Sequence, residues 1–80
     1  MTWRIEWSPL AEHRLRELPW RDATRVDAAV LQFANTGKGQ LVRLPSDAPI
    51  TLRLCVTPYY VRLTLDPFSG VMHIWTVYRL

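Results

Sequence analysis

Residues 51–80 of this chain read TLRLCVTPYYVRLTLDPFSGVMHIWTVYRL, and this stretch decides the fold. Apolar and polar residues alternate over residues 50–56 and again over 59–65, which is typical of strands with one buried face. A third run, residues 71–78, is apolar at both parities, so we expect it to lie inside the sheet. The connections between the runs are short and rich in proline and glycine, which predicts antiparallel pairing of the three strands.

Two helices are predicted upstream of these strands. Ser8 is a good N-cap and Pro9 a good first helical residue, and Pro19 restricts the residue before it, so the first helix ends at Leu18. The second helix begins near Trp20 and ends at a Gly-Lys-Gly segment. Its buried stripe consists of apolar residues at helical spacing, namely Ala23, Val26, Val30, Phe33 and Ala34.

Two short strands complete the prediction, one over residues 3–7 and one over 40–44. The alternation WRIEW directs the first two tryptophans toward the helices, and Trp20 is expected to pack in the core or at its rim. We therefore expect a single α+β domain over residues 1–80 with the order β-α-α-β-β-β-β. In this fold a two-helix hairpin packs on one face of a small antiparallel sheet and leaves the other face partly open.

The net charge of +3 lies entirely in the C-terminal half of the chain. The five arginines and five acidic residues of the first 36 positions cancel. The remaining residues hold five cations against Asp47 and Asp66, and these cations are Lys38, Arg43, Arg53, Arg62 and Arg79. A basic stripe of this kind favours a polyanion or an acidic partner, although it also serves solubility alone.

The composition excludes several classes of protein. Cys55 is the single cysteine, so no intramolecular disulfide forms, which suits a reducing compartment. The N-terminus shows no signal-peptide pattern, and no apolar run is long enough for a membrane helix, so we expect a cytoplasmic protein without membrane contact. Two distant histidines and one cysteine make no metal-ligand cluster, and we expect neither a metal nor another cofactor.

The period of two places Arg53, Tyr60 and Arg62 on the sheet face opposite the apolar residues. The parity of the last strand is ambiguous, because both parities are apolar. If Met72, Ile74 and Thr76 face the helices, then the open face also receives His73, Trp75, Val77 and Arg79. Arginines beside aromatic rings suit single-stranded nucleic acid, whose phosphates pair with guanidinium groups and whose bases stack. The alternative is a solvated face on which arginine stems cover apolar surface.

Several short segments form a recognisable set: Ser8-Pro9-Leu10-Ala11 after a short strand, Arg43-Leu44, Leu52-Arg53-Leu54, Tyr59-Tyr60-Val61 with Asp66, and the closing Val77-Tyr78-Arg79. This set resembles the RelE/ParE toxins of bacterial type II toxin–antitoxin systems. The resemblance covers nearly the whole chain and agrees with the element order derived above. In this family the RelE branch cleaves messenger RNA in the ribosomal A site, and the ParE branch poisons DNA gyrase. Both are neutralised by an antitoxin whose extended segment wraps the toxin.

The resemblance implies roles for individual residues. Arg53 and Arg79 match basic family positions, whereas Tyr60 stands where an arginine is usual, and Arg62 could replace that arginine from the same face. Some relatives carry a catalytic tyrosine in a C-terminal extension, which we do not expect here because the sequence stops at Leu80. The catalytic set is therefore expected to be Arg53, Tyr60, Arg62 and Arg79. Contacts to nucleic acid are expected from the basic and aromatic set Arg43, Arg53, Arg62, His73, Trp75 and Arg79.

The leading expectation is ribosome-dependent mRNA cleavage, with a cognate antitoxin, the ribosome and mRNA as partners. In that reaction a ribose 2′-hydroxyl attacks the adjacent phosphate, which requires a base, an acid and positive charge on the transition state. The arginines would supply the charge, and Tyr60 or His73 would carry the proton. Two alternatives stay open, namely a non-enzymatic inhibitor of DNA gyrase and a decayed relative that acts only by binding.

Overall fold

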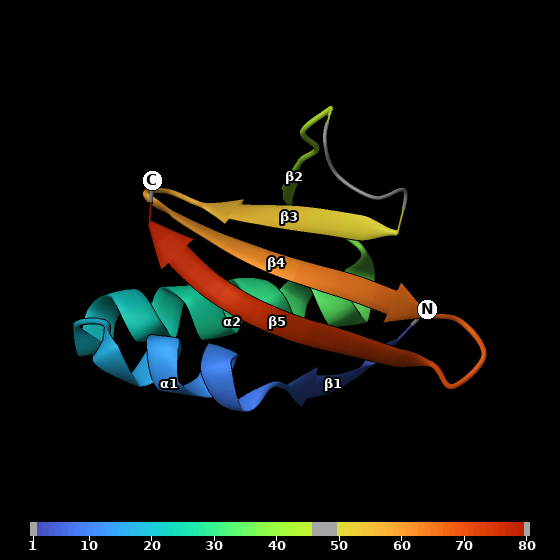
Figure 1. The fold of residues 1–80 in the computed structure, drawn as a ribbon, viewed down its shortest axis with the longest axis horizontal. Helices are drawn as coiled ribbons and strands as arrows, with labels where there is room; N and C mark the ends of the chain where they lie inside the picture. The colour runs from blue at the N-terminus through green and yellow to red at the C-terminus, as the bar shows by residue number, and fades with distance from the viewer. Residues whose placement is uncertain (1, 46–49, 80) are drawn as a thin grey trace.

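The structure, a computed structural model, describes residues 2–45 and 50–79. Its elements follow the predicted order: β1 Arg4–Trp7, α1 Pro9–Glu17, α2 Trp20–Thr36, β2 Gln40–Val42, β3 Thr51–Val56, β4 Tyr59–Asp66 and β5 Val71–Arg79. The five strands form one sheet in the order β1-β5-β4-β3-β2, with β5 in the interior as predicted (Figure 1). Most of the turn predicted before β3 lies outside the described residues.

The sheet is mixed, and in this respect the prediction of an antiparallel sheet was wrong. β2, β3, β4 and β5 pair antiparallel, whereas β1 runs parallel to β5, with Arg4 beside Val71 and Trp7 beside Ile74. The reason lies in the helix that follows β1. The backbone N–H of Ser8 continues the ladder by donating to the Ile74 carbonyl at 2.9 Å, so the chain reaches α1 over the C-terminal half of β5.

Ser8 fixes the start of α1 in the way the sequence predicts. Its hydroxyl oxygen accepts a hydrogen bond from the backbone N–H of Ala11 at 3.0 Å, and Pro9 follows as the first helical residue. The same hydroxyl donates to the carbonyl oxygen of Trp75 at 2.8 Å. One side chain therefore caps α1 and ties it to β5. The second helix ends at Gly37, whose φ of 73° is the left-handed conformation that favours glycine.

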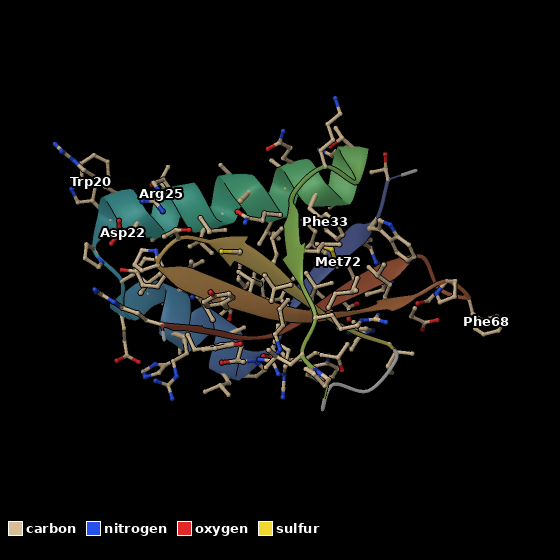
Figure 2. All side chains as sticks on the ribbon, turned by 90° about the horizontal axis from the view of Figure 1, so that it is seen from above. Trp20, Asp22, Arg25, Phe33, Phe68 and Met72 are labelled. Carbon is tan, nitrogen blue, oxygen red and sulfur yellow. The ribbon has the colours of Figure 1, made fainter. Side chains whose placement is uncertain are left out.

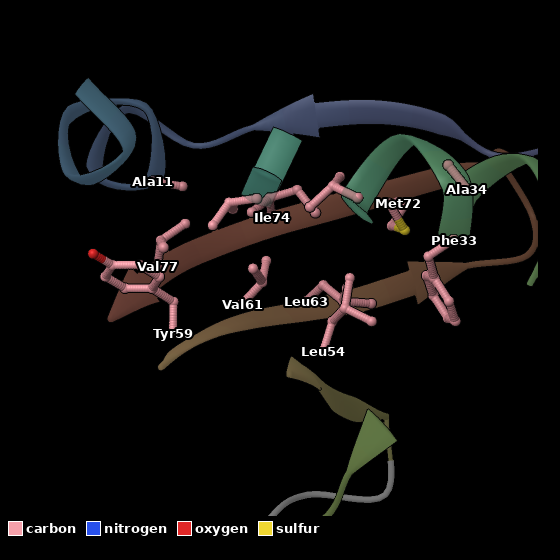
Figure 3. Close-up of a cluster of buried hydrophobic side chains, with 12 residues drawn as sticks. Ala11, Phe33, Ala34, Leu54, Tyr59, Val61, Leu63, Met72, Ile74 and Val77 are labelled. Carbon is pink, nitrogen blue, oxygen red and sulfur yellow. The ribbon is translucent and has the colours of Figure 1, made fainter. Parts of the chain in front are cut away.

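The core lies between α2 and the sheet. Figure 2 shows α2 along one side of the sheet, with Phe33 and Met72 in the space between them. Figure 3 shows the cluster, in which the apolar residues of β3, β4 and β5 meet the predicted stripe of α2. Its buried members are Ala11, Val26, Val30, Phe33, Ala34, Leu54, Tyr59, Val61, Leu63, Met72, Ile74 and Val77. Each fully buried Leu or Ile contributes about 1.5–3 kcal/mol by leaving water.

The tryptophans divide into two groups. Trp3 and Trp7 pack against the core from the helix side, as predicted. Trp20 is 72% exposed at the start of α2, so the expectation that it packs in the core was wrong (Figure 2). The Arg21 guanidinium covers its ring at 5.2 Å. Neither α1 nor α2, the helices of the described residues, is long and apolar enough to cross a membrane.

Candidate nucleic-acid interface

The sheet face opposite α2, called the open face below, presents polar and aromatic side chains in three rows across the strands. Cross-strand partners lie on the same face of a sheet, so the registers of β3–β4 and β4–β5 define each row. The rows follow one another along β4 at two-residue steps, which is about 6.6 Å per step. The first row contains Tyr60 and Tyr78, the second Arg53, Arg62 and Thr76, and the third Thr64 and His73.

The middle row places two arginines directly opposite each other. Arg53 on β3 and Arg62 on β4 are register partners, and like charges in this arrangement repel. Arg53 is half-buried and donates a hydrogen bond to the Tyr78 hydroxyl, with its guanidinium carbon 5.7 Å from the centre of that ring. Arg62 is exposed, and within residues 2–45 and 50–79 it makes no hydrogen bond or ion pair. Both guanidinium groups therefore belong to the same row of the open face, and an anion bound over this row could contact both of them.

An aromatic pair lies on either side of the arginine row. The rings of Tyr60 and Tyr78 stack with centroids 5.7 Å apart and planes 22° from parallel. On the other side, His73 and Trp75 stack at 5.5 Å, and the Trp75 indole N–H donates to the Thr64 hydroxyl at 2.8 Å. Trp75 is 42% exposed. Stacking surfaces spaced along a basic stripe are what a single strand of nucleic acid requires.

A β-bulge in β5 changes which residues reach the open face. The register jumps from Arg62 beside Thr76 to Leu63 beside Ile74, so Trp75 is the additional residue. Its carbonyl is the one that the Ser8 hydroxyl binds. The bulge keeps His73 and Trp75 on the open face, as expected. It reverses the parity of everything after it, so Val77 is buried against the helices and Tyr78 faces outward.

The expectation that Arg79 lies on the open face was wrong for the same reason. Arg79 is the partner of Tyr59, whose side chain belongs to the core face. It lines a cavity of about 190 Å³ between the end of α1 and the ends of β4 and β5, together with Arg14, Glu17 and Leu18. The structure thus brings Arg53, Tyr60 and Arg62 together and separates Arg79 from them.

Arg43 and His73 lie at opposite sides of the interface. Arg43 is exposed just beyond the end of β2, at the edge of the sheet farthest from β1. His73 lies beside β1, where its Nδ1 is 3.6 Å from a carboxylate oxygen of Glu6. Because His73 and the two stacked tyrosines occupy the outer rows, they are separated by about 13 Å along β4. Each outer row lies one step, about 6.6 Å, from Arg62.

A second polar cluster connects the start of α2 with the end of the sheet. The Tyr59 hydroxyl donates to the Asp22 carboxylate at 2.6 Å, and Arg25 binds both Asp22 and the carbonyl oxygen of Thr57. The hydrogen bond to Asp22, together with burial, raises the pKa of Tyr59 above 10.0. The phenol therefore stays neutral and holds α2 to β4. This cluster is structural, since Tyr59 faces the core.

Sequence reasoning did not include Glu6, Thr64 or Tyr78 in the interface, although it offers Tyr78 beside Tyr60 as a source of a phenol. The alternation in WRIEW places Glu6 on the outward face, which was a usable signal. Thr64 shares the parity of Arg62, but threonine alone carries no functional signal. Tyr78 was hidden by the bulge, because uninterrupted alternation from His73 assigns it to the core.

Comparison with known proteins supports the fold. No protein-family profile matches the chain, and no curated protein matches it in sequence. Among solved structures, it is similar to a chain of the toxin–antitoxin complex RelBE2 from Mycobacterium tuberculosis, with a TM-score of 0.69, 20% identity and full coverage of both chains. It is also similar to a chain of the RelB–RelE antitoxin–toxin complex from Methanococcus jannaschii. There the TM-score is 0.71 and the identity 10%, over 91% of this chain and 87% of the other.

These similarities define the class of the fold. The chain has the α+β architecture, two helices on a five-stranded mixed sheet, found in structures of RelBE toxin–antitoxin complexes. At 10–20% identity this likeness concerns the fold, and function must be argued from the open face.

Proposed function

We propose that this protein is the toxin of a toxin–antitoxin pair, that its open face binds single-stranded mRNA, and that it inhibits translation by cleaving that mRNA on the ribosome. One observation carries the proposal: Arg53 and Arg62 face each other between two stacked aromatic pairs of the open face. The fold similarity to chains of RelBE complexes supports the toxin–antitoxin assignment, with a cognate antitoxin as the partner.

The arrangement supplies what phosphate chemistry needs. Two guanidinium groups on neighbouring strands can bind the non-bridging oxygens of one phosphate and stabilise the additional negative charge of the transition state. Tyr60 and Tyr78 lie one row away, so their hydroxyls are the groups placed to exchange a proton with the reacting oxygens. Arg53 holds the Tyr78 hydroxyl in place. Arg79, on the other side of the sheet, is not part of this proposed centre.

The alternative target, DNA gyrase, is favoured by a different surface. Trp20 and Leu31 are 72% and 52% exposed and lie on one stripe of α2, with Thr24 and Asp27 between them. A stripe at helical spacing with two exposed apolar residues suits contact with a protein. This function would depend on α2 and not on the open face.

Expression of the protein in bacteria tests the two targets together. Protein and DNA synthesis are followed by pulse labelling after induction of the parent, Arg62→Thr and Trp20→Ala. The control is Arg16→Gln, which removes one positive charge from an exposed position of α1. We expect protein synthesis to fall first with the parent, Trp20→Ala and the control, and to continue with Arg62→Thr. If DNA synthesis falls first, or if Arg62→Thr remains fully toxic, the proposal is wrong.

A further inference from the structure

The open face ends at a cavity that the arginine and tyrosine rows leave unexplained. This cavity, of about 260 Å³, lies where β1 turns into α1 beside β5. It is lined by Glu6, Trp7, Ser8, Pro9, His73, Ile74 and Trp75. We infer that it is a subsite for one guanine base of the bound RNA strand, stacked on the Trp75–His73 pair and hydrogen-bonded to the Glu6 carboxylate. This inference rests on the proposed function and adds base preference to it.

The walls of the cavity fit a flat aromatic ligand. His73 and Trp75 form a stacked pair, and Trp75 is fixed in place by its hydrogen bond to Thr64. The bulge that positions Trp75 is itself held by the Ser8 hydroxyl at the cavity wall. A rigid aromatic platform that remains 42% exposed offers a stacking surface at little entropic cost.

Glu6 supplies the recognition chemistry. Its carboxylate is half exposed and lies 3.6 Å from His73 Nδ1 and 3.7 Å from an Arg4 nitrogen, so both contacts are longer than hydrogen bonds. Among residues 2–45 and 50–79, no hydrogen bond occupies either oxygen. A carboxylate only accepts, and it can accept two parallel hydrogen bonds. It also repels phosphate, so it directs the phosphates toward Arg62 and the base toward itself.

Guanine is the base whose edge matches this acceptor pair. Its N1–H and N2–H groups are adjacent donors, whereas adenine and cytosine place an acceptor nitrogen next to their amino group. Uracil flanks its single N–H with two carbonyls. The Watson–Crick edge is available because the bases of a single strand are unpaired. Thr64 and His73 lie one row, about 6.6 Å, from Arg62, so a base can stack here while its phosphate reaches the arginines.

RNA binding by the full chain tests the inference. Fluorescence anisotropy compares an oligouridylate with the same oligomer carrying one central guanosine or one central adenosine. We expect the guanosine to raise the affinity of the parent by about five- to a hundredfold, the range of one bidentate base contact, and the adenosine to raise it far less. Glu6→Gln should remove the guanosine preference without weakening the binding of oligouridylate, because the substitution removes a carboxylate that repels phosphate. Arg62→Thr should weaken binding of all three oligomers alike and keep the preference.

The outcomes separate this inference from the proposed function. If oligouridylate binds in an Arg62-dependent way without a guanosine preference, or if Glu6→Gln keeps the preference, the subsite is refuted and the proposed function stands. If no oligomer binds, the proposed function fails. In that case the guanine subsite is tested with free nucleosides, by following the NMR signal of the Trp75 indole N–H. The subsite is supported if guanosine shifts this signal in the parent, while uridine does not, and if guanosine no longer shifts it in Glu6→Gln. If guanosine does not shift the signal in the parent, the subsite is refuted.

Discussion

The opposed arginines lead to a prediction that links stability to function. Replacing Arg62 with threonine should stabilise the protein and weaken its binding to RNA. Arg62 is exposed, makes no hydrogen bond or ion pair with the described residues, and lies directly opposite Arg53. Threonine favours strands, and removing one of two like charges in a cross-strand pair is worth roughly 0.2–1 kcal/mol. For a domain of this size, a gain near the middle of that range raises the melting temperature by about 2–4 °C.

The same substitution at Arg53 should have the opposite effect on stability. Arg53→Thr relieves the same repulsion, but it also removes the hydrogen bond to the Tyr78 hydroxyl and the contact with that ring. Those two contacts are together worth roughly 1–2.5 kcal/mol. The balance is a net loss of about 1 kcal/mol, so Arg53→Thr should melt below the parent while Arg62→Thr melts above it.

Thermal unfolding followed by circular dichroism measures the change in stability, with Arg16→Gln as the control for removal of a positive charge. Fluorescence anisotropy with an oligouridylate at several salt concentrations measures the change in RNA binding. The slope of log affinity against log salt should fall by about 0.7 for Arg62→Thr, the value for one phosphate contact on a single strand. If Arg62→Thr melts below the parent, Arg53 and Arg62 do not destabilise the fold by repulsion. If its salt slope equals that of the parent, Arg62 does not contact a phosphate.

Two further predictions concern the fold. Tyr59→Phe should flatten the loss of stability in alkaline solution, as measured by urea unfolding. The raised pKa of Tyr59 means that its hydrogen bond to Asp22 stabilises the folded state below pH 10.0, and this contribution is lost as pH rises through the folded value. Gly39→Ala should cost about 1–3 kcal/mol, because its Cβ would lie 2.6 Å from a buried methyl carbon of Leu54. The double variant with Leu54→Ala should show a clearly non-additive loss, and additive losses would contradict this explanation.

Most of the fold could be predicted because its signals are local. Ser8 and Pro9 at the start of α1, the glycine at the end of α2 and the alternation in β3 and β4 each depend on a few neighbouring residues. The parallel partner of β1 could not be predicted in this way. Its direction depends on how α1 packs against β5, about 65 residues later in the chain, and no local pattern records that contact.

The candidate site was predicted up to the bulge and not beyond it. Alternation assigns faces correctly while the period of two continues, which places Arg53, Tyr60, Arg62 and His73. After the additional residue Trp75 the assignment reverses, so Tyr78 takes the place on the open face that was expected for Arg79. In the structure the buried positions of β5 step from Ile74 to Val77, a spacing of three that the sequence does not reveal because Trp75 between them is also apolar. A break in period within a strand indicates a bulge, and bulges are frequent beside functional sites.

The opposed arginines of the open face are better explained by binding than by solubility. A sheet face that only needed solubility would gain more from mixed charges, which attract across strands, than from two opposed guanidinium groups, which repel. The chain uses mixed charges elsewhere, in the pairs Arg4–Glu6 and Arg25–Asp22. Acidic residues are absent from the register partners of Arg53 and Arg62 within the described strands. An RNA phosphate bound over this row would meet positive charge from two neighbouring strands, which is the arrangement that the proposed function requires.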